Sequence, residues 1–583
     1  MLRYIKKPIK ELLVNDNIFA LYTGQRKYVW GKDEIIKLIQ DIKLYGKKGL
    51  YINEGAYVKD TIQTQKYGKI ECIKIYDSFQ RLTTLTLILA NIRIRLYVNI
   101  KKYKNEIKLI EKVLYSNINI NGNKFVILSL SPMFNDNQIY ENLVENIDID
   151  KNSIKTIFDD KLINANNVIE RELRKYSDEE LIDFLHNILE NVTITLDNIP
   201  DHLAHTKFNT INNCRVNLTT LEMLKDYLFT IYNEDEKFLD LLAEEWYKLQ
   251  CLLEPSTIRT MGKYKINVNK FLRHYILSKA DVTCNFSKKN IYNWFIKLKL
   301  NNKEDVLNLV KDLLENAKYY IEYINNYKRY ECILNIRELG HEQSAGVFLA
   351  AYNLEEKQRE EIIGLLEKIA FCFIFSGLNP NKQTKIFIDV IKSINDNNIN
   401  NAKKILKDNI VDLKKLTLNS ILNKVFNIKN YNDRKKIRCI LTLIGNRMND
   451  KINEYETFEI EHILPQEKCW QDEQLYGKQE WYKDDNFYNI TINKLGNFTY
   501  LEKNDNNKLG NNTFLEKIDI YTDYEEKCAL TYLISGNKPK VRTKQINSVL
   551  EKHPYYRSEK WGKIEIDYRS EWLVSILEEI IFD

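Results

Sequence analysis

Four polar residues near the C-terminal end of the chain have the types and spacing of a hydrolytic site. Glu461 and His462 end the run ETFEIEH, which alternates apolar and polar residues as a half-buried strand does. Asn497 follows a Leu-Gly turn, and Asn506 lies nine residues further on. A histidine is largely neutral at pH 7 and can take a proton from water. Carboxylate and amide oxygens suit Mg²⁺ or Mn²⁺, so the pattern predicts metal-assisted hydrolysis of a phosphodiester.

The sequence around these residues predicts a small α+β module. After the strand that ends at His462, the stretch NKLGNFTYLEKNDNNKLGNN has the pattern of a turn, a strand, and a polar turn before a helix. A histidine at the end of an apolar strand is, taken alone, more often structural than catalytic. The neighbouring Glu461, Asn497 and Asn506 favour the catalytic interpretation, and the lack of a C-x-x-C pair argues against zinc.

The strings EHILPQ and LGNFTYLEKNDNNKLGNNTFLEK resemble the HNH, or ββα-metal, nuclease module at the C-terminus of GmrSD-type modification-dependent (type IV) restriction endonucleases. The resemblance covers roughly residues 455–520. It implies that His462 is the general base and that Asn497 holds and orients it. It further implies Glu461 and Asn506 as ligands of Mg²⁺ or Mn²⁺ and Lys508 as a phosphate contact, with a solvated surface lysine as the alternative for Lys508.

A second candidate site lies near the N-terminus, in the run from Asp77 to Arg81. This run joins a strand-like segment to the predicted helix that begins near Leu82, and the turn between a strand and a helix offers backbone N–H groups to an anion. Arg81 could fork onto phosphate oxygens, Asp77 could hold a metal, and Gln80 could orient a ligand or water. In the alternative interpretation, Asp77 and Arg81 cap the helix and pair with each other.

The same region resembles the N-terminal, ParB-like domain of the GmrSD-type proteins, whose hallmark is D-G-Q-Q-R followed by L-T-T-L. The string GQRKYVW at 24–30 is similar to the family's Y-Q-R-x-Y-x-W entry, and FNTINNCRVNLTTLEMLK is similar to a later family stretch. The resemblance implies binding and hydrolysis of a nucleoside triphosphate. The residues that it assigns to the nucleotide site are Gln25, Arg26, Asp77, Gln80, Arg81 and Asn212.

Three departures from the family pattern fall in this second candidate site. Ser78 replaces a glycine, Phe79 replaces the first glutamine, and Arg215 stands where a later glycine is expected. A glycine lets backbone approach a ligand closely, and a glutamine supplies an amide to the pocket. We therefore expect the loop to bind an anion through Arg81 but to turn over nucleotide less efficiently than an intact motif.

Composition and hydropathy limit the class of protein. The 583 residues carry a net charge of only +6, so a nucleic-acid surface must come from local clustering. The nine cysteines are scattered without a disulfide framework, and no apolar run approaches the roughly 20 residues of a membrane span. These features favour the cytoplasm and exclude a membrane partner. The 18 glycines and 8 prolines are few, which favours long helices.

The sequence as a whole predicts a predominantly helical α+β protein. We expect a ParB/sulfiredoxin-like sensor domain at 1–235, a helical connecting domain at 236–425, and an HNH (ββα-metal) nuclease domain at 426–583. The predicted function is metal-dependent cleavage of phage or foreign double-stranded DNA, with modified bases as the implied target. The alternatives are a regulatory protein that binds nucleic acid or a partner without cutting, and a toxin-like nuclease that needs no nucleotide. The oligomeric state stays open, a homo-oligomer included.

Overall fold

The computed structural model describes most of the chain, and the statements below concern these residues only. The described ranges are 4–13, 18–21, 27–64, 68–75, 79–120, 123–131, 138–198, 219–232, 236–260, 266–281, 287–325, 336, 340–448, 458–537, 544–555 and 559–582.

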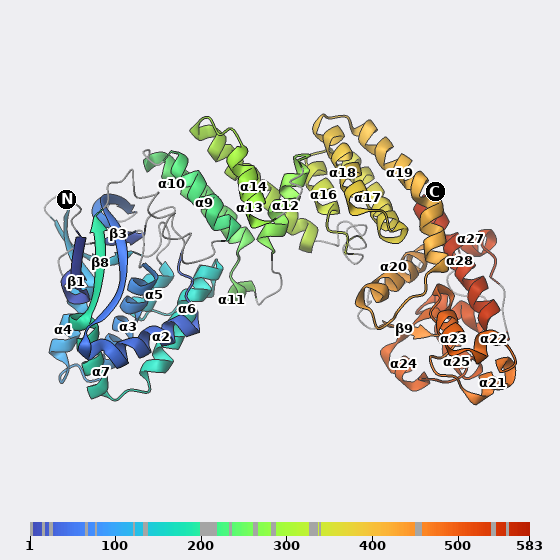
Figure 1. Ribbon diagram of the computed structural model, residues 1–583, viewed down its shortest axis with the longest axis horizontal. Helices are drawn as coiled ribbons and strands as arrows, with labels where there is room; N and C mark the ends of the chain where they lie inside the picture. Colours follow the sequence, from blue (N-terminus) through green and yellow to red (C-terminus); the bar gives the residue numbers. More distant parts are fainter. Residues whose placement is uncertain are drawn as a thin grey trace. The chain divides into compact units, whose positions relative to one another are not determined.

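The chain divides into two compact units, each with its own sheet (Figure 1). Unit 1 comprises Met1–Arg273 and Thr283–Ile321, and unit 2 comprises His274–Val282 and Glu322–Asp583. Helices predominate in both, which confirms the predicted helical α+β class. The division into three domains stays a prediction, because the expected helical middle is distributed between the two units.

Unit 1 is built on a six-stranded mixed sheet with the order β1-β8-β3-β4-β2-β7. The pairs β1·β8 and β3·β4 are antiparallel, whereas β3·β8, β2·β4 and β2·β7 are parallel. The strand-like segment that the sequence predicts before Asp77 is β4. A separate antiparallel hairpin joins β5 and β6. The strands of unit 1 are β1 (Tyr4–Pro8), β2 (Phe19–Leu21), β3 (Leu50–Thr64), β4 (Gly68–Ile75), β5 (Tyr115–Ile120), β6 (Asn123–Leu128), β7 (Leu130–Ser131) and β8 (Val192–Asn198).

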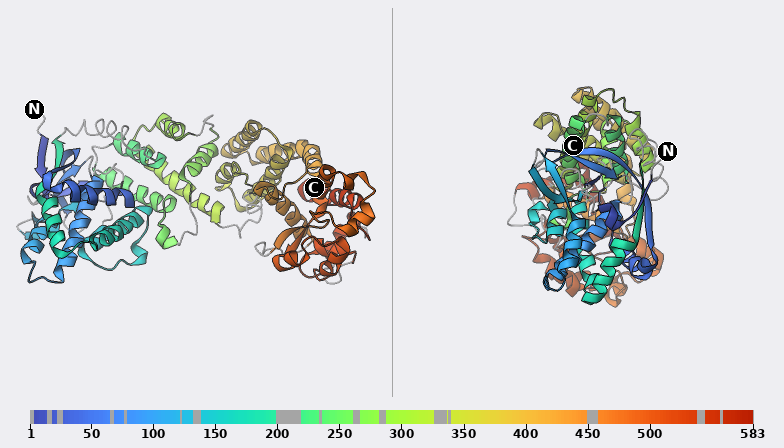
Figure 2. Two further views of the ribbon diagram at one scale, coloured as in Figure 1. Left: turned by 60° about the horizontal axis from the view of Figure 1, so that its bottom comes forward. Right: turned by 90° about the vertical axis from the view of Figure 1, so that its left-hand side faces the viewer.

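Helices pack beside this sheet and form one apolar core with it (Figure 2). The central helix is α3 (Phe79–Tyr97), which the sequence predicts to begin near Leu82. In the structure α3 is buried nearly all round from Leu82 to Ala90, because α4, α5, α6 and α7 surround it. The first helices of unit 1 are α1 (Ile9–Leu13), α2 (Lys32–Tyr45), α3, α4 (Lys104–Leu114), α5 (Gln138–Glu145), α6 (Ile157–Leu173) and α7 (Asp178–His186).

A further group of helices completes unit 1. The first of them begins with a capping box: the Thr219 hydroxyl accepts from the Glu222 backbone N–H, and the Glu222 carboxylate accepts from the Thr219 N–H. These helices are α9 (Thr220–Ile231), α10 (Glu236–Leu253), α11 (Thr257–Thr260), α12 (Val268–Ser278), whose last residues belong to unit 2, α13 (Lys288–Lys297) and α14 (Lys303–Asn325).

Unit 2 begins with helices that share one core with the C-terminal module. Helix α17 packs along α19, and both α19 and α20 contact the last helix of the chain, α28. These helices are α16 (Ser344–Ala351), α17 (Glu356–Ser376), α18 (Pro380–Asn395), α19 (Ile399–Asn423), α20 (Tyr431–Arg447) and α28 (Lys563–Phe582).

The C-terminal module contains the two antiparallel strands that the sequence predicts. The polar turn expected after the second strand is wrong, because residues 503–509 form a helix. Strand β9 (Phe458–His462) pairs with β10 (Phe498–Glu502), so that His462 lies opposite Phe498, and α24 (Lys503–Leu509) follows β10 directly. The insert between the strands is helical. The remaining helices of the module are α21 (Trp470–Tyr476), α22 (Glu480–Lys483), α23 (Asp485–Ile492), α25 (Phe514–Thr522), α26 (Ala529–Tyr532) and α27 (Lys544–Lys552).

The turn before β10 packs directly against the backbone of α28. A Cβ atom at Gly496 would lie 2.0 Å from the carbonyl oxygen of Ile566 and 2.7 Å from the backbone nitrogen of Ser570. The Gly496 N–H donates to the Ser570 hydroxyl at 2.8 Å. Only a glycine lets these two segments approach so closely, which explains the glycine of the Leu-Gly turn.

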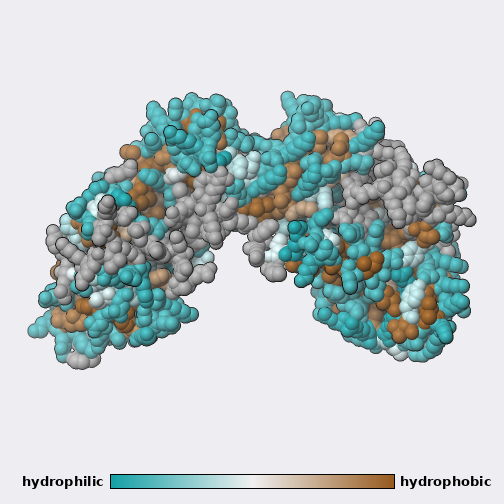
Figure 3. Space-filling model, turned by 180° about the vertical axis from the view of Figure 1, so that it is seen from behind, coloured by the Kyte–Doolittle hydropathy of each residue, from teal (hydrophilic) through white to brown (hydrophobic). Residues whose placement is uncertain are grey.

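The face of the protein drawn in Figure 3 is mainly hydrophilic where it is coloured. On the face drawn in Figure 3, apolar residues occur in small groups among hydrophilic ones, as is usual for a folded protein. None of the described helices is both long enough and apolar enough to cross a membrane.

The contact at Gly496 yields a stability prediction. We expect Gly496→Ala to destabilise unit 2 by about 3 kcal/mol, because the new methyl group meets backbone atoms that cannot move aside independently. The matched control is Gly364→Ala in α17, where a Cβ meets nothing within 4 Å and a helical alanine is favoured over glycine. Chemical unfolding of both variants measures the difference. Equal free energies of unfolding for the two variants would contradict the proposed contact.

Candidate active site

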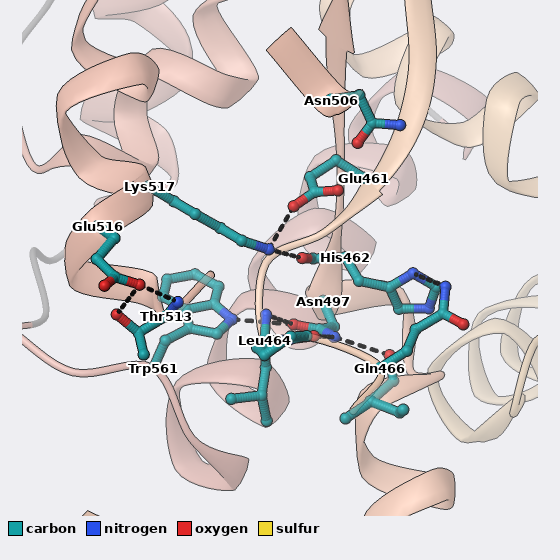
Figure 4. Close-up of polar contacts among 12 residues, drawn as sticks. Glu461, His462, Leu464, Gln466, Asn497, Asn506, Thr513, Glu516, Lys517 and Trp561 are labelled. Atoms are coloured by element: carbon teal, nitrogen blue, oxygen red, sulfur yellow. Dashed lines mark hydrogen bonds and ion pairs between the residues drawn. The ribbon is translucent and has the colours of Figure 1, made fainter. Parts of the chain in front are cut away.

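The strand pair and the helix after it bring the predicted residues of the C-terminal site into one region (Figure 4). Glu461 and His462 are the last two residues of β9, and Asn497 immediately precedes β10. Asn506 lies in α24, which follows β10 without a loop. Residues more than thirty positions apart in the sequence therefore meet because the two strands pair antiparallel.

Asn497 is fully buried and braces the loop after His462. Its Oδ1 accepts from the Leu464 backbone N–H at 2.7 Å and from the indole N–H of Trp561 at 3.2 Å. Its Nδ2 donates to the carbonyl oxygens of Leu464 at 3.0 Å and Ile492 at 2.8 Å. The predicted holding role thus acts on the backbone beside His462, and none of these bonds reaches the imidazole ring.

His462 is 4 % exposed, and its ring packs edge-on against Phe498 with the ring centroids 4.9 Å apart. The ring nitrogens contact two amides: Nε2 lies 3.3 Å from Oδ1 of Asn493, and Nδ1 lies 3.1 Å from Nε2 of Gln466. Burial lowers the pKa of His462 to about 4, and the nearby Lys517 charge adds to the shift. The imidazole is therefore neutral near pH 7, as a general base must be.

Glu461 is also buried, and it contacts a buried lysine. The Lys517 ammonium, from α25, donates to the Glu461 carboxylate and, at 2.7 Å, to the carbonyl oxygen of His462. Burial raises the pKa of Glu461 above its usual range, although Lys517 opposes the shift. Neighbouring residues of a strand point to opposite faces, so this carboxylate and the His462 ring have different partners on the two sides of β9.

Asn506 contacts the same face of β9 as Glu461 does. Its Nδ2 donates to the carboxylate of Glu459 at 2.9 Å, and Glu459 lies two residues before Glu461. Lys508, the predicted phosphate contact, is an exposed side chain 3.4 Å from the carboxylate of Asp505. A loose exposed pair of this kind contributes little to stability, so Lys508 can leave it to contact a phosphate.

The oxygen donors on this face match a hard divalent cation in type. Glu461, Glu459 and Asn506 offer carboxylate and amide oxygens, which Mg²⁺ and Mn²⁺ prefer. Within the described ranges, no group of three or more His, Cys, Asp or Glu side chains is spaced to hold a metal. An ion at Glu461 and Asn506 would therefore complete its coordination with water, as Mg²⁺ commonly does.

The N-terminal candidate site is only partly visible. Four of its predicted residues lie outside the described residues, and these are Gln25, Arg26, Asp77 and Asn212. Gln80 contacts backbone: its Oε1 accepts from the Val29 N–H at 2.9 Å, and its Nε2 donates to the carbonyl oxygen of Lys27 at 3.0 Å. The Arg81 guanidinium lies 5.9 Å from the centre of the Trp30 ring. The structure thus joins residues 27–30, the described part of the GQRKYVW string, to the start of α3.

Two protein-family sequence models match the chain, one in its N-terminal part and one in its C-terminal part. The model of the GmrSD restriction endonuclease N-terminal domain matches residues 9–229, and the model of the C-terminal domain of GmrSD restriction endonucleases matches residues 417–576. The chain belongs to the GmrSD restriction endonuclease family. A search of the curated proteins found no match. In this GmrSD protein the C-terminal match contains the whole of the site described above, including β9, β10 and α24.

Sequence reasoning missed three residues of the GmrSD C-terminal site: Gln466, Asn493 and Lys517. Gln466 belongs to the string EHILPQ, and Lys517 ends the string LGNNTFLEK, so the motifs contained a signal for both. Asn493 lies at the end of the helical insert and is the first residue of the stretch NKLGNFTYLEKNDNNKLGNN, but the sequence predicted no role for it. Its contact with His462 depends on how the insert folds back, which the pattern of residues alone does not specify.

The low pKa of His462 predicts how the stability of this GmrSD chain depends on pH. The ring takes up a proton more readily when unfolded, so its contribution is complete above pH 6.5 and is lost as the pH falls toward 4. The loss should be about 3 kcal/mol. The free energies of unfolding of the parent and of His462→Gln are measured from pH 7 to pH 4. Relative to the variant, the parent should lose this amount of stability over that range. Parallel curves would show that the ring is not buried as a neutral group.

Proposed function

We propose that this chain is an HNH endonuclease, dependent on Mg²⁺ or Mn²⁺, that cuts phage or other foreign DNA with modified bases. One observation carries the proposal: a buried histidine ends a strand that is paired with the strand following Asn497 and is adjacent to the helix of Asn506. A ββα-metal module requires this arrangement. Membership of a family of restriction endonucleases supports DNA as the substrate.

In the proposed mechanism His462 takes a proton from a water molecule. The oxygen of that water forms a bond to phosphorus, while the bond from phosphorus to the 3′ oxygen breaks and that oxygen gains a proton from solvent. The products carry 5′-phosphate and 3′-hydroxyl ends. Asn497 contributes by fixing the backbone after His462, which holds the base in position before the substrate arrives.

Glu461 and Asn506 would hold the divalent cation. When bound, such a cation supplies positive charge that stabilises the phosphate oxygens during displacement. Lys517 supports this role because it fixes one oxygen of the Glu461 carboxylate. Without Lys517, the buried carboxylate would stand alone, and breaking a buried ion pair costs roughly 3–5 kcal/mol. Lys508 would contact a neighbouring phosphate from the surface of α24.

The N-terminal unit would serve as a ParB-like sensor in this proposal. Its sheet and the start of α3 would bind a nucleoside triphosphate, with Arg81 as an anion contact. Gln80 would act by holding residues 27–29 against α3, since both atoms of its amide bond the backbone there. Because Ser78 and Phe79 depart from the family motif, we expect weaker turnover of nucleotide than in relatives with the intact motif.

A cleavage assay tests the proposal. Purified parent protein and His462→Ala are incubated with Mg²⁺ or Mn²⁺ on plain DNA and on DNA containing glucosylated hydroxymethylcytosine, with and without nucleoside triphosphates. We expect metal-dependent cutting of the modified DNA by the parent and a loss of at least about 100-fold in the variant. His186→Ala, at a half-buried histidine of α7, is the matched control and should cut as the parent does.

The other outcomes of this assay identify the alternatives. If neither DNA is cut under any condition, a regulatory binding protein replaces the nuclease proposal. If both DNAs are cut without nucleotide, the chain is a nuclease without that control, as a toxin would be. If His462→Ala cuts as well as the parent, the active site lies elsewhere.

A further inference from the structure

We propose that a small pocket of unit 1 binds one oxygen of a phosphate group, with Lys27 and Lys225 as its cationic contacts. That this phosphate belongs to a nucleotide rests on the proposed sensor function of unit 1, whereas the binding of phosphate itself can be tested alone. We call this site the lysine pocket, and the residues that line it include Lys27, Phe158, Glu222, Lys225, Trp246 and Glu254.

The size of the lysine pocket limits what can enter it. Its enclosed space is about 10 Å³, close to the least that one water molecule needs. A base or a sugar is too large for this space, whereas a single oxygen of a phosphate fits and the rest of the group stays at the mouth. Phe158 of α6 and Leu221 of α9 make part of the wall apolar, which strengthens charge contacts with that oxygen.

Lysine side chains from three segments gather at the lysine pocket. The Lys27 ammonium lies 4.7 Å from the centre of the Tyr247 ring of α10, and the Lys155 ammonium lies 5.8 Å from the same ring. Burial and the Lys27 charge together lower the pKa of Lys225 to about 7. Like charges this close repel each other, and an anion between Lys27 and Lys225 removes the repulsion.

The two carboxylates of the pocket do not prevent an anion from binding. Glu222 is held at the start of α9, where it accepts from the Thr219 backbone N–H at 2.8 Å. Glu254 accepts from the Gln250 amide at 3.0 Å, and burial raises the pKa of Glu254 to about 7. Near pH 7, Glu254 is therefore about half protonated. An arriving anion favours the protonated forms of both Glu254 and Lys225, so the pocket becomes positive as the anion binds.

Trp246 decides between an anion and a cation as the ligand. Its side chain is 2 % exposed, it lines the lysine pocket, and its indole N–H has no hydrogen-bond partner among the described residues. An indole nitrogen can only donate, so it matches an acceptor oxygen and does not match a metal ion. A buried donor without an acceptor destabilises the protein. A phosphate oxygen in the pocket satisfies this donor and contacts the lysines as well.

Lys27 connects the lysine pocket with the start of α3. Its side chain lines the pocket, while its carbonyl oxygen accepts from the Gln80 amide at 3.0 Å. The same amide accepts from the Val29 backbone N–H, and Arg81 is the next residue of α3. An anion held by Lys27 therefore acts on the segment that packs against α3. This makes the pocket a second phosphate contact of the proposed sensor, in addition to Arg81.

Calorimetric titration of the full chain tests the inference. The probes are inorganic phosphate, ATP, and adenosine, which has no phosphate. The variants are Lys225→Met, which removes a charge, and Trp246→Phe, which keeps an aromatic ring but has no N–H. Lys237→Met is the matched control, since Lys237 is an exposed lysine of α10 that does not line the pocket.

We expect the parent to bind phosphate and ATP but not adenosine. Lys225→Met should weaken phosphate binding at least about 10-fold, because a charged contact is lost, and Trp246→Phe should weaken it about 5-fold, because one hydrogen bond is lost. Lys237→Met should bind as the parent does. If Lys225→Met fails to fold, Lys27→Met takes its place, because the contact of Lys27 with Gln80 uses only the backbone.

Proton uptake separates a ligand contact from a merely structural role of Lys225. The charged groups that act on Lys225 are Lys27, Glu222, Asp226 and Glu254. Sulfate has the shape of phosphate and does not titrate near pH 7, so any proton change comes from the protein. Titration with sulfate at pH 7 in two buffers of different ionisation enthalpy should show a net uptake of protons by the parent. The uptake should be smaller in Lys225→Met.

The inference is overturned if the parent binds neither phosphate nor sulfate. It is also overturned if the parent, Lys225→Met and Trp246→Phe bind phosphate equally, or if the pocket takes Mg²⁺ in place of an oxyanion. Binding of phosphate as expected without binding of ATP would support the lysine pocket and contradict the nucleotide sensor. ATP binding that is equal in the parent and Lys225→Met, with no binding of phosphate, would do the reverse.

Discussion

The C-terminal site depends on one buried amide, the side chain of Asn497. Its four hydrogen bonds join the loop after β9, the end of the helical insert and the segment that leads into α28. Each of these bonds is made inside the protein, where an unmatched donor or acceptor would cost roughly 1–3 kcal/mol. The backbone that carries His462 is therefore fixed by a residue that never contacts its ring.

The C-terminal helix α28 also holds the backbone around Asn497. The guanidinium of Arg569 donates to the carbonyl oxygens of Gly496 at 2.8 Å and Phe498 at 2.7 Å, so it spans the residues on both sides of Asn497. The same helix packs against α19 and α20 of unit 2. The site is consequently continuous with the core of unit 2, and a displacement of α28 would also displace the loop after His462.

The two strands of the C-terminal module could be predicted from residue patterns. The alternation in ETFEIEH and the Leu-Gly turn indicate β9 and the start of β10 correctly, because such patterns reflect local backbone geometry. The partners of the site residues could not be predicted in this way. Lys517 meets Glu461 across 56 positions, and Asn493 meets His462 across an insert whose folding decides the contact. The expected link from Asn497 to His462 is likewise indirect, since chain spacing does not show which atoms an amide reaches.

Hydrogen exchange tests the central claim, that the Asn497 amide holds the loop after His462. In the parent protein we expect the peptide that contains Leu464 to exchange its backbone N–H as slowly as strand β9 does, because that N–H is bonded to Oδ1 of Asn497. In Asn497→Ala the same peptide should exchange quickly, while the peptides of α19 keep the protection they have in the parent. Equal protection of the Leu464 peptide in the two proteins would contradict the account.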